Sequence, residues 1–204
     1  AANMKQQIIL IHGGDSFKTY KDYLNFLKSS QFDLKSLKKK RKDWKDNLSQ
    51  KLGKDFEIIY PVMPNKRNAK YLEWKIWFEK LIPYIKSEVI LIGHSLGGIF
   101  LAKYLSENKF PKKIKAVFLI AAPYCNVPNF KLPKNLNKLE KQSEKIFIYY
   151  SKDDPLVPLA DFKKYQKELK NATIRFFTNR GHFNQSQLPG LIRDIKNLRL
   201  NPGS

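Results

Sequence analysis

A five-residue segment near the middle of the chain carries the clearest chemical signal. It reads Gly-His-Ser-Leu-Gly with the serine at position 95, it follows an apolar run over 89–92, and it precedes a segment with helical spacing. A serine hydroxyl is presented at the tip of a strand when the chain turns sharply into a helix, and flanking glycines permit that turn. The N-terminus of such a helix directs free N–H groups at the serine. We therefore predict that Ser95 is a nucleophile and that the Leu96 N–H is an oxyanion donor.

Glycine-rich turns between a strand and a helix also bind phosphates, which is the main alternative for this segment. The sequence has no Gly-Lys-Ser/Thr and no Gly-x-Gly-x-x-Gly pattern. Phosphate binding normally depends on one of those patterns, so the nucleophile is the favoured interpretation.

A serine nucleophile needs a general base and an acid that orients the base. His182 lies in a Gly-His turn after the last apolar run, whereas His12 and His94 belong to other motifs. Two neighbouring acids, Asp153 and Asp154, follow the preceding apolar run. We prefer Asp154 because it begins the spacing Asp-x-x-Val-Pro and because the chain order Ser, Asp, His is that of α/β-hydrolases. Asp153 would then be a turn or capping residue.

The first apolar run ends in His-Gly-Gly at residues 12–14. An oxyanion hole needs two N–H groups that converge on one point, and a turn of this kind supplies the second from the backbone of Gly14. We expect His12 to hold the loop in shape by hydrogen bonding and not to transfer protons. Asp15 and Ser16 could cap the helix that follows or reach the substrate, and we favour the capping role.

Short apolar runs alternate with helical segments along the whole chain. This alternation predicts an α/β fold with three layers, in which helices cover both faces of a mostly parallel six-stranded sheet. Ligands of such sheets bind at the carboxyl ends of the strands, where all the candidate residues lie. The apolar runs cover about 7–12, 56–60, 88–93, 115–121, 145–150 and 172–178, and the helical segments cover 20–28, 34–52, 69–85, 96–107, 159–169 and 188–198.

The length of 204 residues fits a single domain, which we expect to cover residues 4–200. The one long irregular stretch, 123–143, contains three prolines and is predicted to form a rim loop or a small lid. Tyr124 in this stretch and Phe183 next to the predicted base are candidate substrate contacts in an acyl pocket. Trp74 and Trp77 are expected in the buried stripe of the helix over 69–85.

The chain is strongly basic, with 39 Lys and Arg against 18 Asp and Glu and a formal charge of +21. Only six of the basic residues are arginine. The 39 basic residues as a whole are spread over every polar stretch. The pattern favours a solvated lysine-rich surface over binding to nucleic acid or to an anionic surface. The densest basic run covers 35–45. Apolar residues from Leu34 to Leu52 recur through and beyond this run at steps of three or four, which predicts one amphipathic helix over 34–52.

The composition excludes several classes of protein. A hydrophobic content of 42% with 13% aromatic residues is too high for a disordered chain. The single cysteine, Cys125, excludes a disulfide scaffold. The sequence contains no run of about 18 apolar residues, so we do not expect a membrane span. We therefore expect a cytoplasmic protein without a metal site, and we predict no particular oligomeric state.

Together these residues resemble the α/β-hydrolase superfamily, and more narrowly the small serine hydrolases of the retinoblastoma-binding protein 9 and YdeN family. Beyond Ser95, Asp154 and His182, the segment Met-Pro-Asn at 63–65 with Trp74 nine residues later is similar to an element of that family. The resemblance implies a shortened hydrolase sheet that lacks the first antiparallel hairpin. It also implies hydrolysis of a small-molecule carboxyl ester or amide without a cofactor.

The function hypothesis is therefore a serine hydrolase that forms an acyl-enzyme, with carboxylesterase-like chemistry. Thioesterases and acyltransferases use the same residue types and stay open as alternatives. The alternative from another class is a protein-binding or polyanion-binding module on a hydrolase scaffold. The basic stretch over 33–52 is longer than a minimal family member needs, which leaves a lid, a dimer contact or a partner surface there as further alternatives.

Overall fold

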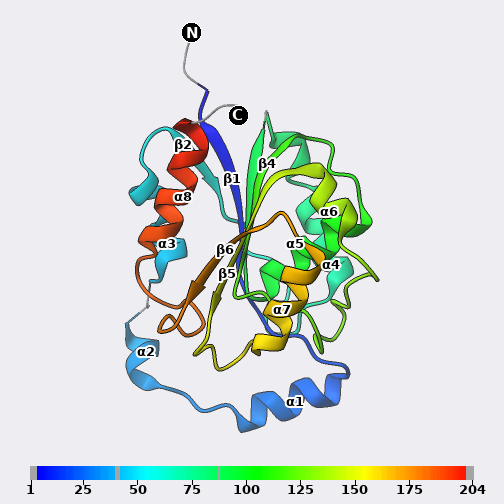
Figure 1. Ribbon diagram of the computed structural model, residues 1–204. Coiled ribbons are helices and arrows are strands. Elements are labelled where there is room, and N and C mark those ends of the chain that lie inside the picture. Colours follow the sequence, from blue (N-terminus) through cyan, green and yellow to red (C-terminus); the bar gives the residue numbers. More distant parts are fainter. Residues whose placement is uncertain (1–3, 40–41, 87, 201–204) are drawn as a thin grey trace.

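A six-stranded sheet forms the centre of the molecule (Figure 1). The computed structural model describes residues 4–39, 42–86 and 88–200. All five neighbouring strand pairs are parallel, and the strand order is β2-β1-β3-β4-β5-β6. The predicted α/β fold is confirmed, and the sheet is wholly parallel. The strands are β1 (Gln6–Ile11), β2 (Phe56–Ile59), β3 (Val89–His94), β4 (Ile114–Ile120), β5 (Ser143–Ser151) and β6 (Thr173–Phe177).

The central strands are apolar on both faces because helices cover both sides of the sheet. Every residue of β3 is buried, and β1 and β4 each have only one residue that is not. Burying one such aliphatic side chain contributes about 1.5–3 kcal/mol relative to leaving it exposed. Continuous apolar runs are therefore the pattern expected of parallel strands in this kind of fold.

Two apolar clusters lie on the two faces of the sheet. One cluster contains Ile9 and Leu91 from the strands together with side chains of α4, α5, α6 and α7. The other contains Ile8 and Ile90 together with side chains of α3 and α8. Figure 1 shows the same separation, with α3 and α8 on one side of the sheet and α4 to α7 on the other. The helices are α1 (Tyr20–Ser29), α2 (Leu34–Lys38), α3 (Trp44–Leu52), α4 (Tyr71–Glu79), α5 (Leu96–Glu107), α6 (Asn137–Gln142), α7 (Leu159–Glu168) and α8 (Pro189–Leu200), and a 3₁₀ turn covers Ile82–Tyr84.

The prediction of one amphipathic helix over 34–52 is wrong. The segment forms two helices, α2 and α3, and the second begins with a capping box in which Asp43 and Asp46 bond to each other's backbone N–H groups. Only the second helix is amphipathic in the expected sense, because it buries Trp44, Leu48 and Leu52. Leu34 in α2 stays 66% exposed. Capping boxes mark helix starts, so the chain begins a new helix at this point.

The predicted helix over 69–85 is shorter than expected. Helix α4 ends at Glu79, and Pro83 lies in the separate 3₁₀ turn, because proline lacks the N–H that an α-helix needs. Trp74 is buried as predicted, together with Phe78, but Trp77 is not part of the buried stripe and remains 45% exposed.

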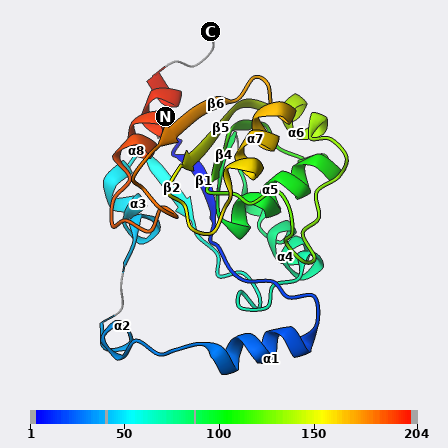
Figure 2. The same cartoon turned by 60° about the horizontal axis from the view of Figure 1, so that its bottom comes forward.

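Helices α1 and α2 lie beside the edge of the sheet where the strands end, at the bottom of Figure 1 and toward the viewer in Figure 2. None of the ten residues of α1 is buried. Its N-cap is Thr19, in a capping box with Asp22, so Asp15 and Ser16 do not cap this helix. Within the part of the chain that the structure describes, none of the helices is long and apolar enough to cross a membrane.

Candidate active site

Ser95 lies in the turn between β3 and α5, with backbone angles of φ 54° and ψ −119°. Positive φ is strained for a residue with a side chain and is typical of functional turns. The turn is tight, because a Cβ built on Gly93 would lie 2.4 Å from the carbonyl oxygen of Gly97. Glycine at position 93 therefore permits the sharp strand-to-helix turn that was predicted from the motif.

Three side chains from distant parts of the sequence form one hydrogen-bonded chain. The Nε2 atom of His182 lies 2.8 Å from the hydroxyl oxygen of Ser95. The Nδ1 atom of the same ring lies 2.9 Å and 3.1 Å from the two carboxylate oxygens of Asp154. Both His182 and the Asp154 side chain are shielded from solvent. An imidazole placed between a hydroxyl and a carboxylate is the arrangement that nucleophilic serine chemistry requires.

The structure distinguishes the two neighbouring acids. Asp154 contacts the imidazole, and one of its oxygens also accepts the N–H groups of Leu156 and Val157 at 2.8 Å and 3.1 Å. Asp153 instead accepts the hydroxyl of Ser151 at 2.5 Å and the N–H of Gly181 at 2.9 Å. These hydrogen bonds lower the pKa of the Asp153 carboxyl. Asp153 thus links the end of β5 to the loop that carries His182.

The residues predicted to supply the two oxyanion N–H groups, Leu96 and Gly14, lie beside Ser95 in one pocket. Leu96 is the first residue of α5, so its N–H has no acceptor within the helix. Gly14 lies in the loop after β1 and lines the same pocket as Ser95 and Leu96. The predicted oxyanion donors are therefore brought to the same pocket as the hydroxyl.

His12 holds the loop that carries Gly14. Its Nε2 atom accepts the N–H of Met63 at 2.9 Å, so the ring proton is on Nδ1, which donates to the carbonyl of Gly13 at 2.6 Å. Burial lowers the pKa of His12, which keeps the ring neutral at neutral pH. The expected structural role of this histidine agrees with these contacts.

A pocket of about 430 Å³ opens next to Ser95 and His182. Its walls come from the loop after β1, from the loop after β4 and from the turn after β5. The irregular stretch over 123–143 contributes Pro123 and residues 125–128 to the wall, and α6 lies near its end. This volume is in the range of sites for small organic ligands. The lining residues are Gly14, Asp15, Ser16, Ser95, Leu96, Pro123, Cys125, Asn126, Val127, Pro128, Leu156, Val157, Pro158, Asp161 and His182.

The two candidate substrate contacts do not line this pocket. Phe183 is fully buried in the cluster between the sheet, α3 and α8, where it packs on Tyr149 and Phe177. Tyr124 lines a neighbouring pocket, and its ring packs against Tyr165. Phe183 has a positive φ of 54°, and its side chain enters this cluster while His182 lines the pocket.

The sequence-based reasoning missed Asp161. Its carboxylate is buried at the start of α7 and accepts the N–H groups of Tyr124 and Cys125 at 2.8 Å and 3.2 Å. Asp161 also lines the pocket next to Ser95. It therefore fixes one wall of the pocket. An acid that follows Pro158 by three residues carries no motif, so no local signal identified it.

Lys45 and His94 were also missed as part of the site. Lys45 donates to the Nδ1 atom of His94 at 3.0 Å, and the Nε2 atom of His94 lies 2.7 Å from the carbonyl oxygen of His182. Burial and the nearby ammonium group of Lys45 hold the pKa of His94 well below its usual value. His94 is therefore neutral and does not compete with His182 as a base. Among the residues that the structure describes, no cluster of His, Cys, Asp and Glu is suited to a metal ion.

Comparison with known proteins agrees with the geometry. The family model of serine hydrolases matches residues 33–190. Serine hydrolase RBBP9 of Rattus norvegicus is 25% identical over 151 residues, which cover 70% of this chain and 78% of the rat protein. The chain therefore belongs to the serine hydrolase family, and it is an enzyme of the hydrolase class.

Solved structures share the fold. The ydeN gene product of B. subtilis superposes with a TM-score of 0.72 at 16% identity, covering 97% of this chain and all of the other. A putative yden-like hydrolase from Pectobacterium atrosepticum has a TM-score of 0.60 at 14% identity, with 96% and 92% of the two chains covered. A predicted CIB-like hydrolase from Thermoplasma acidophilum has a TM-score of 0.62 at 15% identity, with 98% and 89% covered. These likenesses show an α/β-hydrolase fold and confirm the resemblance to RBBP9 and YdeN.

Proposed function

We propose that this protein hydrolyses small carboxyl esters or amides through an acyl-enzyme on Ser95. The hydrogen-bonded chain from Asp154 through His182 to the Ser95 hydroxyl carries this proposal. The pocket of about 430 Å³ next to the hydroxyl supports a small acyl substrate. Its volume leaves room for a short acyl group and part of a leaving group.

The first half of the reaction forms the acyl-enzyme. The Nε2 atom of His182 takes the proton of Ser95 as the serine oxygen forms a bond to the acyl carbon. The carbonyl oxygen becomes an oxyanion, which accepts hydrogen bonds from the N–H groups of Leu96 and Gly14. Asp154 holds the proton on Nδ1 and stabilises the imidazolium. The oxyanion then collapses, the bond to the alcohol or amine breaks, and His182 returns its proton to that leaving group.

The second half releases the acid. A water molecule gives its proton to His182 and attacks the acyl carbon, and a second oxyanion forms in the same place. When it collapses, the bond to Ser95 breaks and His182 returns the proton to the serine oxygen. The enzyme is regenerated, and the net reaction adds one water to the ester or amide bond.

The test compares the wild type with Ser95→Ala and, as a control, Ser30→Ala at an exposed position at the end of α1. A fluorophosphonate probe should label the wild type and Ser30→Ala but not Ser95→Ala. Hydrolysis of p-nitrophenyl acetate and butyrate should fall at least about 10³-fold in Ser95→Ala, as in other serine hydrolases that lose the nucleophile. Circular dichroism checks that the variants are folded.

Two outcomes would contradict the proposal. Equal labelling of Ser95→Ala would place the nucleophile elsewhere. A folded wild type that neither reacts with the probe nor turns over any ester of the series would favour the alternative of a binding module on a hydrolase scaffold. If the wild type is active, a matched series of p-nitrophenyl esters and thioesters with increasing acyl length defines the depth of its acyl pocket.

A further inference from the structure

Lys45 differs from the other lysines of this basic protein in its burial. It is 9% exposed and is the single lysine among the buried polar residues of the described part of the chain. Its ammonium group pairs with Asp43 at 2.6 Å and donates to the Nδ1 atom of His94 at 3.0 Å. A buried ammonium group is costly unless it is paired, so these two partners explain how α3 accommodates it.

The contact with Lys45 decides which nitrogen of His94 carries the proton. An ammonium group has three donors and no acceptor, so the Nδ1 atom of His94 must be an acceptor. The proton of the neutral ring is then on Nε2, and Nε2 donates to the carbonyl oxygen of His182 at 2.7 Å. The chain of contacts runs from Asp43 through Lys45 and His94 to the backbone of the proposed general base.

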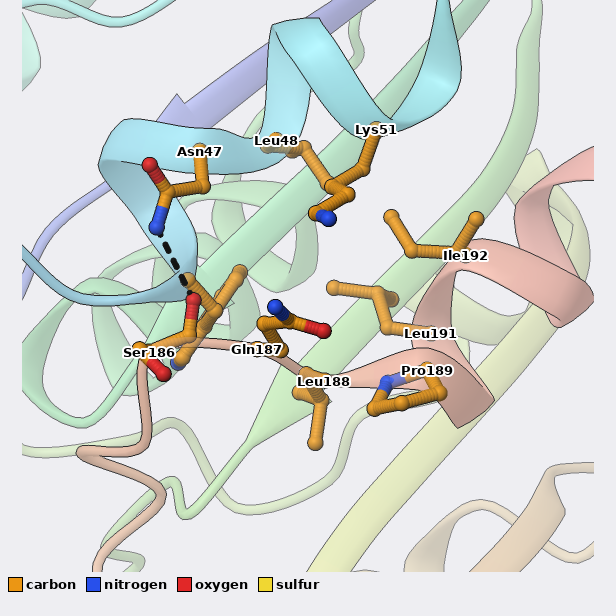
Figure 3. Close-up of a pocket in the computed structure, with 10 residues that line it drawn as sticks. Asn47, Leu48, Lys51, Ser186, Gln187, Leu188, Pro189, Leu191 and Ile192 are labelled. Atoms are coloured by element: carbon orange, nitrogen blue, oxygen red, sulfur yellow. Dashed lines mark hydrogen bonds between the residues drawn. The ribbon is translucent and has the colours of Figure 1, made fainter.

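Helix α3 also binds the residues that follow His182 in the loop between β6 and α8. The indole N–H of Trp44 donates to the carbonyl of Phe183 at 2.8 Å, and its backbone N–H donates to the carbonyl of Gln185 at 2.9 Å. One turn further along α3, Asn47 donates to the carbonyl of Ser186 at 3.0 Å, the dashed contact in Figure 3. The same view shows Leu48 of α3 facing Leu191 across a small pocket at the start of α8.

We propose that Lys45 and His94 are positioning residues for catalysis, because together they set where the imidazole of His182 lies. The inference depends on the proposed function, since it assumes that His182 is the general base. Helix α3 bonds to carbonyl groups of residues that follow His182, whereas His94 bonds to the carbonyl group of His182 itself. Misplacing a catalytic group by about 1 Å can cost about 10²-fold in rate. Lys45 acts through His94 and touches neither the substrate nor the reacting atoms.

The experiment compares variants that break the chain with one that preserves it. Lys45→Met keeps an unbranched side chain that is one atom shorter and removes the donor to His94. His94→Phe keeps a ring and removes both hydrogen bonds, whereas His94→Gln keeps one acceptor and one donor. The control is Lys103→Met in α5, which removes another lysine with a mostly shielded side chain, 14% exposed and paired with Glu107 at 2.5 Å.

Three measurements separate positioning from stability. The rate of fluorophosphonate labelling reports on the reactivity of Ser95, steady-state kinetics separate kcat from KM, and thermal unfolding gives Tm. Proton NMR follows the Nδ1 proton of His182, which bonds to Asp154. We expect kcat and the labelling rate to fall about 10- to 100-fold in Lys45→Met and His94→Phe with little change in KM. His94→Gln should retain most activity, the Nδ1 proton signal should shift or broaden only where activity is lost, and Lys103→Met should match the wild type in rate.

The outcomes also separate this inference from the proposed function. A wild type that the probe does not label would contradict the proposed function itself. A labelled wild type together with Lys45→Met and His94→Phe variants of unchanged kcat would overturn only the positioning role. The same conclusion follows if activity falls merely in step with Tm, if Lys103→Met loses as much rate as Lys45→Met, or if His94→Gln is as slow as His94→Phe.

Discussion

Gly97 lies directly against the backbone of Ile11, and a Cβ built at position 97 would be only 2.3 Å from the carbonyl oxygen of Ile11. The contact joins the start of the helix after Ser95 to the end of the strand before Gly14. The two loops proposed to form the oxyanion hole are therefore held together by backbone packing. No residue larger than glycine fits between them without moving one of the loops.

Gly97→Ala should therefore destabilise the protein and disturb the site. We expect a loss of about 1–3 kcal/mol in the free energy of unfolding, because the added methyl group meets backbone atoms that cannot rotate away. The control is Gly190→Ala, whose Cβ would have no neighbour closer than 3.9 Å and which should change stability by about 0.5 kcal/mol or less. Urea unfolding measures both. Equal stability of the two variants would show that the contact with Ile11 is not limiting.

The two adjacent acids should respond differently to the same substitution. Asp154→Asn leaves the shape of the side chain but removes the charge next to the imidazole, and we expect kcat to fall by about 10⁴-fold, as in other triads. Asp153→Asn weakens contacts to Ser151 and Gly181, so it should lower Tm while retaining much more activity. Ester hydrolysis and thermal unfolding on both variants test this. A larger rate loss in Asp153→Asn would reverse the assignment of the acid.

The buried imidazole of His94 should make stability depend on pH. Burial and the charge of Lys45 lower its pKa in the folded protein, and its other neighbour is His182. The unfolded chain, with a histidine pKa near 6.5, then binds a proton that the folded protein does not. Stability from this group is complete above pH 6.5 and is lost as the pH falls toward the folded pKa. The slope is about 1.4 kcal/mol per pH unit for one group.

His94→Gln removes this titration while it retains a donor and an acceptor. Between pH 6.5 and 5, the wild type should lose up to about 2 kcal/mol more than the variant in free energy of unfolding. Chemical unfolding at a series of pH values measures the difference. Parallel curves for the two proteins would mean that His94 titrates alike in the folded and unfolded chains.

Asp161 should control the pocket wall rather than the chemistry. Asp161→Ala leaves the partly buried N–H groups of Tyr124 and Cys125 without their acceptor, at a cost of about 1–3 kcal/mol in total. The segment next to the pocket should loosen, so KM for a short-chain ester should rise more than kcat falls. A steady-state comparison with the wild type tests this, and a loss confined to kcat would instead implicate Asp161 in the reaction.

Much of this architecture was accessible from the sequence because the relevant signals are local. Parallel strands covered on both faces are continuous apolar runs, so the six strands and the edge where they end follow from hydrophobicity alone. The turn around Ser95 has its own glycine signature, and His182 was the one histidine outside another motif. Chain order and the spacing Asp-x-x-Val-Pro then favoured Asp154 over Asp153 as the acid.

Other features were decided only by contacts between distant segments. The spacing after β5 favoured Asp154 as the acid, but the contact of Asp153 with the Gly181 N–H depends on how that turn packs on the last loop. Phe183 enters the core because the backbone turns beyond His182.

The basic segment around 35–45 shows the same division most clearly. Its spacing predicted one helix, but a capping box began a second one, and this helix directed a single lysine into the protein beside His94. Composition alone makes Lys45 one lysine among many on a charged surface. Its burial and its link to His182 depend on a partner 49 residues away in sequence, which only the folded chain brings within hydrogen-bonding distance.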